Sequence, residues 1–160
     1  MTDKLPLAEQ LAQQLLHRRW RLISVESCTG GGIGAELTAL SGSSDWYEGG
    51  WITYSNALKQ RLGVASDLLA THGAVSEPVA RSMVAAGVRA AGVECGVAVT
   101  GVAGPTGGSV EKPVGTVWIA WTIPGQEWSQ PFLFKGDRNA VRQQTITAAI
   151  QGLLGALAEY

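Results

Sequence analysis

Cysteine and histidine are scarce in this sequence of 160 residues, which has two of each. Cys28 and Cys95 could form at most one disulfide, which excludes a disulfide-rich scaffold and suits a reducing compartment. Together with His17 and His72, they show no spacing that resembles a zinc site. We therefore expect no metal site and no cofactor.

An excess of charge of one sign is also missing, because 12 Lys and Arg face 13 Asp and Glu, for a formal net charge of −1. Such a chain has no long-range basic field to attract nucleic acid or an anionic membrane. The longest basic run, residues 17–19 with Arg21 just beyond, suits the solvated end of a helix. The expected partner is a small molecule that is recognised locally, with no nucleic acid and no membrane.

Long apolar runs are absent as well, since no uncharged stretch reaches the ~20 residues of a membrane span. The first residues, MTDKLPLAEQ, carry charges and a proline where a secretory signal would have an apolar core. We therefore expect a cytoplasmic protein.

The residues that are present suit a compact globule, with 46% apolar and 16% charged residues. At this length one hydrophobic core, and hence a single domain over residues 1–160, is the expected organisation. Apolar periodicity, caps and turn residues predict six helices and five strands. The helices are expected over about residues 5–19, 33–40, 56–63, 67–71, 76–91 and 137–157, with Ser55 and Asp137 as caps. The strands are expected over about residues 21–26, 51–54, 96–101, 116–123 and 128–136, the second of them after a turn at Gly49–Gly50.

This alternation of helices and strands predicts an α/β fold, a single-domain layered sandwich with a mixed, largely parallel sheet flanked by helices. In such sheets ligands bind outside the carboxyl ends of the strands, where loops lead into helices. Three loops have that placement, at residues 27–32 (SCTGGG), 54–59 (YSNALK) and 100–108 (TGVAGPTGG).

Ser27 stands where its strand ends, so its hydroxyl should lie near the N–H groups of Thr29, Gly30 and Gly31. Those amides could form an oxyanion hole for acyl transfer, or Ser27 could simply cap the next helix. The G-x-S-x-G motif of a Ser–His–Asp hydrolase is missing, because Glu26 precedes this serine. A serine without a histidine needs another base, and lysine is the usual substitute.

Lys59 is one of only four lysines, and it lies between Leu58 and Leu62 after an apolar strand. Partial desolvation would lower its pKa toward that of a general base, whereas a lysine on a short helix can equally be solvated. Cys28 is a rival nucleophile, because a helix N-terminus lowers the pKa of a thiol. The stretch Gly42–Ser44 resembles the serine-rich loop of amidase-signature enzymes, but the rest of that pattern is missing.

The glycine-rich loop at 100–108 could hold a phosphate through backbone amides, although it lacks the G-K-[ST] ending of a P-loop. Arg138 and Arg142 lie one turn apart at the start of the last helix. They could add charge-assisted hydrogen bonds to a phosphate or lie on an exposed helix face.

Six stretches of the sequence, in this order, resemble the CinA C-terminal domain family. They are ESCTGG (26–31), TYSN with Lys59 (53–59), HGAVSEP (72–78), TGVAGPTGG (100–108), EKPVGTVW (111–118) and GDR (136–138). The resemblance implies a nicotinamide-nucleotide amidase that converts nicotinamide mononucleotide to nicotinic acid mononucleotide and ammonia in pyridine-nucleotide salvage. Many relatives carry this domain behind a molybdopterin-binding-like domain, for which this chain has no room, so it resembles the stand-alone form.

The resemblance further implies a serine–lysine pair, which falls on Ser27 and Lys59. Neutral Lys59 would accept the proton of Ser27 as it attacks the carboxamide, and water would hydrolyse the acyl-enzyme. The residues expected to bind substrate are Thr29, Gly30, Gly31, Tyr54, Asn56, Thr100, Gly101, Gly104, Arg138 and Arg142.

Two alternatives stay open at this point. The chain could be a catalytically silent nucleotide-binding or competence-associated module. Trp118, Trp121 and Trp128 lie near an edge hairpin and could form a homo-oligomer contact or an ordinary core.

Overall fold

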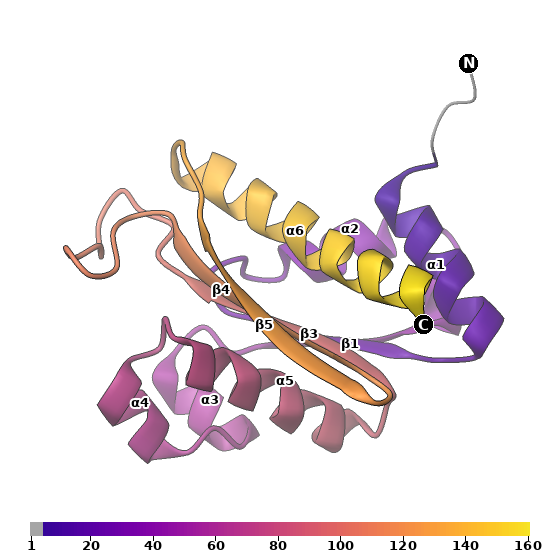
Figure 1. Cartoon of the computed structure of the whole chain (residues 1–160), viewed down its shortest axis with the longest axis horizontal. Coiled ribbons are helices and arrows are strands. Elements are labelled where there is room, and N and C mark those ends of the chain that lie inside the picture. Colours follow the sequence, from indigo (N-terminus) through magenta and orange to yellow (C-terminus); the bar gives the residue numbers. More distant parts are fainter. Residues whose placement is uncertain (1–4) are drawn as a thin grey trace.

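The computed structural model describes residues 5–160, which form one five-stranded sheet with helices on both faces (Figure 1). The helices are α1 (Leu7–Arg18), α2 (Gly32–Thr38), α3 (Asn56–Leu62), α4 (Ser66–His72), α5 (Glu77–Ala91) and α6 (Arg138–Glu159), with a 3-10 turn η1 at Ser43–Asp45. The strands are β1 (Leu22–Glu26), β2 (Tyr47–Ile52), β3 (Cys95–Gly101), β4 (Thr116–Ile123) and β5 (Gln126–Leu133). Residues 1–4, part of the segment in which we expected no secretory signal, lie outside the described residues.

The strands lie in the order β2-β1-β3-β4-β5. Strand β1 pairs in parallel with both β2 and β3, whereas β3 with β4 and β4 with β5 are antiparallel. The predicted mixed sheet and its antiparallel hairpin are therefore confirmed. All five residues of β1 are buried, because it lies between two parallel neighbours and is covered on both faces. The carboxyl ends of β1, β2 and β3 consequently meet at one edge of the sheet.

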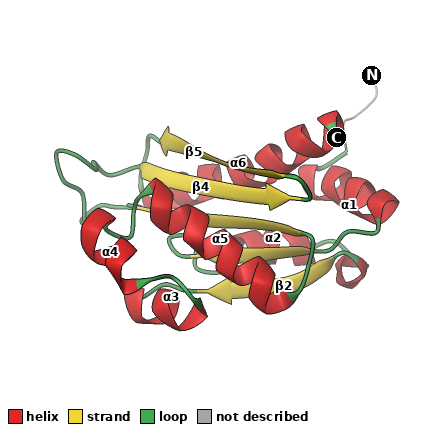
Figure 2. Ribbon diagram, turned by 60° about the horizontal axis from the view of Figure 1, so that its bottom comes forward, coloured by secondary structure: helices red, strands yellow, loops and turns green. Residues whose placement is uncertain are grey.

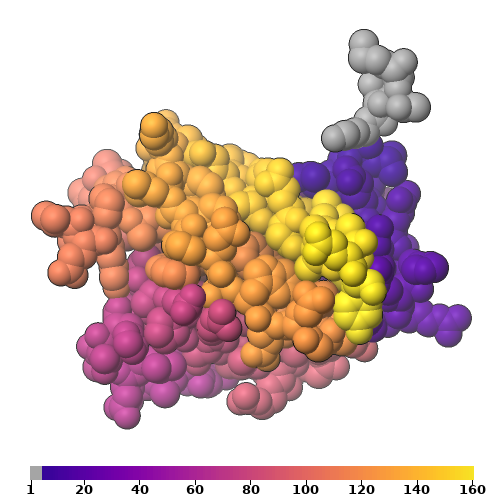
Figure 3. Space-filling view, viewed as in Figure 1, coloured from indigo at the N-terminus to yellow at the C-terminus, as the bar shows by residue number. Residues whose placement is uncertain are grey.

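Helices α1, α2 and α6 cover one face of the sheet, and α3, α4 and α5 cover the other (Figures 1 and 2). Helices α1 and α6, from opposite ends of the chain, lie side by side (Figure 3). The core of the first face includes Leu11, Leu15, Ile33, Val141 and Leu153, and that of the second includes Val25, Val79, Met83 and Ala98. No helix within residues 5–160 is both long and apolar enough to cross a bilayer.

Trp121 belongs to the core, because only 1% of it is exposed. Its ring stacks on Trp128 at a centroid distance of 5.5 Å, and its Nε1–H donates to the Ala149 carbonyl at 2.9 Å. The backbone of α6 approaches so closely that a Cβ at Gly152 would lie 2.4 Å from the indole. For Trp121 the ordinary-core alternative is therefore the correct one.

The predicted turn at Gly49–Gly50 is wrong, since β2 runs through both glycines and ends at Ile52. Gly49 follows a one-residue shift in the pairing of β1 with β2. At Gly50 a Cβ would lie 2.7 Å from Ser24 Oγ and 2.9 Å from Tyr47 Oη, two atoms that are hydrogen-bonded to each other at 2.6 Å. Glycine is thus present here for close packing against a buried hydrogen bond, which the local sequence pattern does not reveal.

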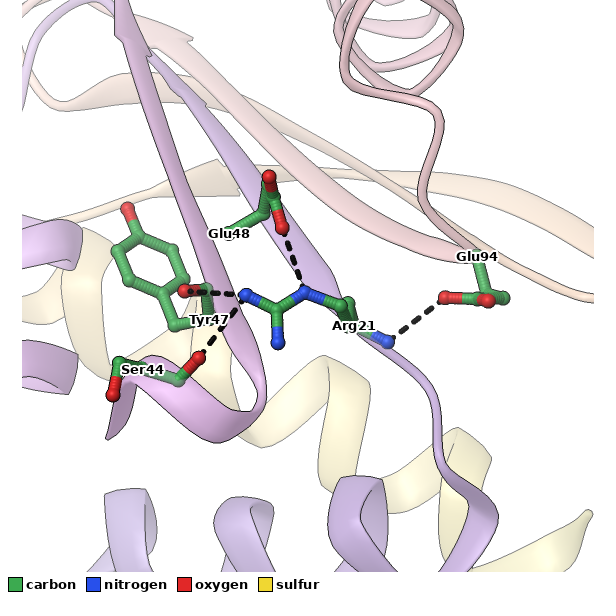
Figure 4. A network of polar contacts seen from close by, with 5 residues as sticks. All are labelled: Arg21, Ser44, Tyr47, Glu48 and Glu94. Carbon is green, nitrogen blue, oxygen red and sulfur yellow. Dashed lines mark hydrogen bonds and ion pairs between the residues drawn. The ribbon is translucent and has the colours of Figure 1, made fainter. Parts of the chain in front are cut away.

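Arg21 links the amino ends of β1, β2 and β3 (Figure 4). Its Nε donates to Glu48 at 2.6 Å, and its Nη2 donates to the Ser44 and Tyr47 carbonyls at 3.1 and 3.4 Å. Its backbone N–H donates to Glu94 at 2.9 Å. The basic residue beyond α1 therefore has a structural role at the end of β1 opposite to Ser27.

Candidate active site

A cavity of about 230 Å³ lies at the edge where β1, β2 and β3 end. It is lined by Ser27, Cys28, Tyr54, Asn56, Lys59, Ala74, Val75, Thr100, Gly101, Ala103 and Arg138. These residues come from the segments that follow β1 and β2, from the end of β3 and the loop after it, from the loop between α4 and α5, and from α3 and the start of α6. The cavity therefore joins all three loops in which the sequence predicts a site.

Ser27 and Lys59 meet in this cavity, with Oγ and Nζ 3.0 Å apart. Ser27 follows β1 directly and its N–H donates to the Val99 carbonyl of β3 at 3.1 Å, which extends the sheet by one residue. Lys59 lies on α3, whose first turn is capped by Ser55, since Ser55 Oγ accepts from the Leu58 N–H at 3.1 Å. Ser27 is 8% exposed and Lys59 is 1% exposed. The structure therefore brings the predicted pair together where little solvent reaches it.

Two backbone carbonyls complete the surroundings of the Lys59 amine. Nζ donates to the Thr53 carbonyl at 2.8 Å and lies 3.3 Å from the Tyr54 carbonyl. A neutral amine has two N–H groups and one lone pair, so the two carbonyls can take both hydrogens and leave the lone pair for the Ser27 hydroxyl. Burial lowers the pKa of Lys59 below the 10.5 usual for lysine, and no described carboxylate forms an ion pair with it. This arrangement can activate a serine.

A family model for the CinA C-terminal domain matches residues 4–157. The chain belongs to this family. It is 50% identical over 149 residues to the nicotinamide-nucleotide amidohydrolase PncC of Pseudomonas putida, covering 92% of this chain and 93% of that protein. With PncC of Escherichia coli K12 the identity is 46% over 157 residues, or 96% and 95% of the two chains. The crystal structure of a CinA superfamily protein from Klebsiella pneumoniae 700603 superposes with a TM-score of 0.92 at 39% identity, covering 96% of this chain and 97% of that one.

Cys28 lines the same cavity in this CinA-family domain, but its thiol is poorly suited to attack. Burial raises the pKa of Cys28 to about 12, which keeps the thiol protonated near neutral pH. The position of Ser43 and Ser44 excludes them as well, because they belong to η1 at the opposite end of β1. Of the three nucleophiles that the sequence offers, the geometry favours Ser27.

Five of the residues predicted to bind substrate line the cavity: Tyr54, Asn56, Thr100, Gly101 and Arg138. Arg138 bridges three segments, because its Nη1 donates to the Gly104 carbonyl at 2.8 Å and its Nη2 to Tyr54 Oη at 3.2 Å. The Thr100 hydroxyl donates to the Ala74 carbonyl at 2.9 Å and holds the loop before α5 against the site.

The other five predicted residues, Thr29, Gly30, Gly31, Gly104 and Arg142, do not line this cavity. Gly30 and Gly31 adopt the left-handed backbone, with φ of 57° and 106°, and form the turn after Ser27. Gly104 contributes the carbonyl that fixes Arg138, and Arg142 Nη2 donates to the Thr29 carbonyl at 3.0 Å. These residues therefore support the residues that line the cavity.

Sequence reasoning missed three contributors. Ala74 and Val75 line the cavity from the loop between α4 and α5. This loop contains the HGAVSEP motif, but the motif alone does not indicate that its residues line the site. The third is Glu26, whose buried carboxylate accepts from the N–H groups of Ile33 and Gly34 at the start of α2. The ESCTGG motif includes Glu26 without indicating its role, because these two contacts span seven and eight residues. Within residues 5–160 no three His, Cys, Asp or Glu side chains gather as a metal site would require.

Proposed function

We propose that this protein is a cytoplasmic nicotinamide-nucleotide amidohydrolase of pyridine-nucleotide salvage, which converts nicotinamide mononucleotide to nicotinic acid mononucleotide and ammonia. The observation that carries the mechanism is the 3.0 Å approach of Lys59 Nζ to Ser27 Oγ, with two carbonyls at the same amine. The similarity to nicotinamide-nucleotide amidohydrolases of the PncC type supports the choice of substrate. Both cysteines are free and buried, which supports a reducing, cytoplasmic setting.

The proposed reaction has two stages. Neutral Lys59 takes the proton of Ser27 as Oγ attacks the carboxamide carbon, and the C–N bond breaks as the same proton passes to the departing ammonia. Water then attacks the acyl-enzyme while Lys59 accepts its proton, which releases the carboxylate product and restores Ser27. The turn after Ser27 supplies the proposed oxyanion donors, since the N–H groups of Thr29 and Gly31 donate to no other residue within 5–160.

The charge of the cavity supports an anionic substrate. With Lys59 neutral, Arg138 is the only charged side chain in its lining. Arg138 also borders a second cavity of about 530 Å³, which the start of α6 and the loop around Pro105 enclose. We propose that the carboxamide lies at Ser27 and that the phosphate lies at Arg138, where a guanidinium can donate two hydrogen bonds.

The test is ammonia release by the purified protein from nicotinamide mononucleotide, nicotinamide riboside and free nicotinamide. We expect rapid turnover of the mononucleotide and poor turnover of nicotinamide, which lacks both the activating pyridinium charge and the phosphate. Binding of the mononucleotide without turnover would instead select a silent nucleotide-binding module.

Activity should rise with pH. The base is the neutral amine of Lys59, so protonation at low pH removes it. Because burial lowers the pKa of Lys59, kcat/KM should fall as pH drops through a value below 10.5 and level off above it. A rate profile with no rising limb between about pH 5 and pH 10 would contradict a lysine base.

Replacing Arg138 with methionine should raise the KM for nicotinamide mononucleotide about tenfold to a hundredfold, since a hydrogen bond to a charged group contributes about 1.5–3 kcal/mol. The kcat should change little, because the guanidinium donates to the Gly104 carbonyl and to Tyr54 Oη and not to Ser27 or Lys59. Steady-state kinetics beside Arg89→Met, which removes an exposed arginine of α5, checks this. An unchanged KM in Arg138→Met would remove Arg138 from the phosphate site.

A further inference from the structure

Thr29 is held from two sides, although the sequence predicts it as a substrate ligand. Its hydroxyl donates to Glu26 Oε1 at 2.6 Å, and its side chain is fully buried. Its carbonyl accepts from Arg142 Nη2 at 3.0 Å and from the Gly32 N–H at 3.0 Å. Both its hydroxyl and its carbonyl are therefore engaged within the protein, and Thr29 does not line the cavity.

Glu26 connects the strand to the helix across the turn that carries the nucleophile. It is the last residue of β1 and is 1% exposed. Besides the Thr29 hydroxyl, its carboxylate accepts from the Ile33 N–H at 2.8 Å and the Gly34 N–H at 3.0 Å. Its carbonyl accepts from the N–H of Thr53, whose own carbonyl accepts from Lys59 Nζ. One residue thus connects the segments that carry Ser27 and Lys59.

We infer that Glu26 and Thr29 are positioning residues for Ser27, and that the side chain of Thr29 does not contact substrate. This inference rests on the proposed function. The Glu26–Thr29 hydrogen bond fixes the turn of residues 27–31 to the end of β1, and Arg142 of α6 fixes the same turn from the other side. The serine is thereby held at hydrogen-bond distance from the amine. Loosening the turn moves the attacking oxygen, and a misplacement of about 1 Å can lower a rate about a hundredfold.

The decisive variant is Thr29→Val, which removes the hydroxyl and keeps the shape of the side chain. We expect kcat for nicotinamide mononucleotide to fall about tenfold to a hundredfold, with KM within about twofold. Thr29→Ser, which keeps the hydroxyl, should restore most of the rate. Thr38→Val is the matched control, since Thr38 is an exposed residue of α2 whose hydroxyl also donates a hydrogen bond, to the Gly34 carbonyl at 2.7 Å. It should behave like the unmodified protein.

Glu26→Gln tests the other partner. The amide retains an oxygen for Thr29 but presents an N–H group to one of the α2 N–H groups, so kcat should fall again. Because both residues belong to one hydrogen-bonded network, the double variant Glu26→Gln/Thr29→Val should lose less than the product of the two single losses. Thermal unfolding of each variant verifies that the protein measured is folded.

Each outcome decides the inference. An unchanged kcat in Thr29→Val, or a raised KM at constant kcat, would overturn it, and the latter would make Thr29 a substrate ligand. If the unmodified protein releases no ammonia, the proposed function fails, and crystal structures then decide the positioning role. In Thr29→Val the Ser27 Oγ to Lys59 Nζ distance should exceed about 3.5 Å, whereas an unmoved pair would refute positioning by Thr29.

Discussion

Replacing Lys59 with methionine is expected to lower kcat for nicotinamide mononucleotide by about 10²–10⁴-fold, the range of a lost general base. Methionine has nearly the length of the lysine side chain and fills the same buried space between β2 and α3. It offers no lone pair with which to accept the Ser27 proton. Ammonia release at saturating substrate measures the loss, and Lys135→Met, which removes an exposed lysine, is the matched control.

The same substitution should stabilise the fold. Because the pKa of Lys59 is lowered in the folded protein, the folded state binds fewer protons at this amine than the unfolded chain does. Burying Lys59 therefore destabilises the folded state near neutral pH, and this destabilisation decreases as pH rises. Methionine removes this destabilisation, and each kcal/mol added to the free energy of unfolding should raise Tm by about 2–4 °C. Activity within tenfold of the unmodified protein, or a lower Tm with normal activity, would contradict a buried neutral base at position 59.

Replacing Ser27 with alanine is expected to lower kcat by about 10⁴-fold or more, because the nucleophile of an acyl-transfer pair cannot be replaced by its neighbours. Cys28 is adjacent in sequence and lines the same cavity, so it provides the sharpest comparison. Cys28→Ala should keep activity within about tenfold, since a thiol with a pKa of about 12 supplies almost no thiolate near neutral pH. Parallel assays of the two variants decide between the sulfur and the oxygen.

The reverse pattern, an active Ser27→Ala and an inactive Cys28→Ala, would identify the Cys28 thiol as the nucleophile. Loss of activity in both variants, with folded protein in each, would show that the shape of the cavity matters more than either nucleophile. Only selective loss in Ser27→Ala agrees with the geometry.

The local features of the fold could be predicted from the sequence because their causes are local. Ser55 and Asp137 each accept a hydrogen bond from an N–H three residues on, as a cap should. Gly49–Gly50 was misjudged because the cause is not local. Gly50 is required by the Ser24–Tyr47 hydrogen bond, which links β2 to the neighbouring strand β1, and a glycine pair alone indicates a turn.

The candidate site shows the same division. From the residues alone, Ser27 could equally have been a helix cap and Lys59 a solvated surface lysine. Only the family resemblance identified the two as a catalytic pair. The burial of Lys59 depends on how α3 packs against the segments that follow β1 and β2, which periodicity does not report. The place of Glu26 was equally hidden, because its carboxylate reaches two N–H groups that become neighbours only when α2 folds back over the end of β1.

The charge of Lys59 can be measured directly. The chain has only four lysines, so NMR titration of lysine side chains labelled with ¹³C and ¹⁵N gives four signals, and Lys59→Met assigns the one in question. The structure predicts that this amine titrates below the usual value for lysine, because it is buried, and is partly neutral where the enzyme is active. Four amines that all titrate near 10.5, the usual value for lysine, would contradict a neutral base beside Ser27.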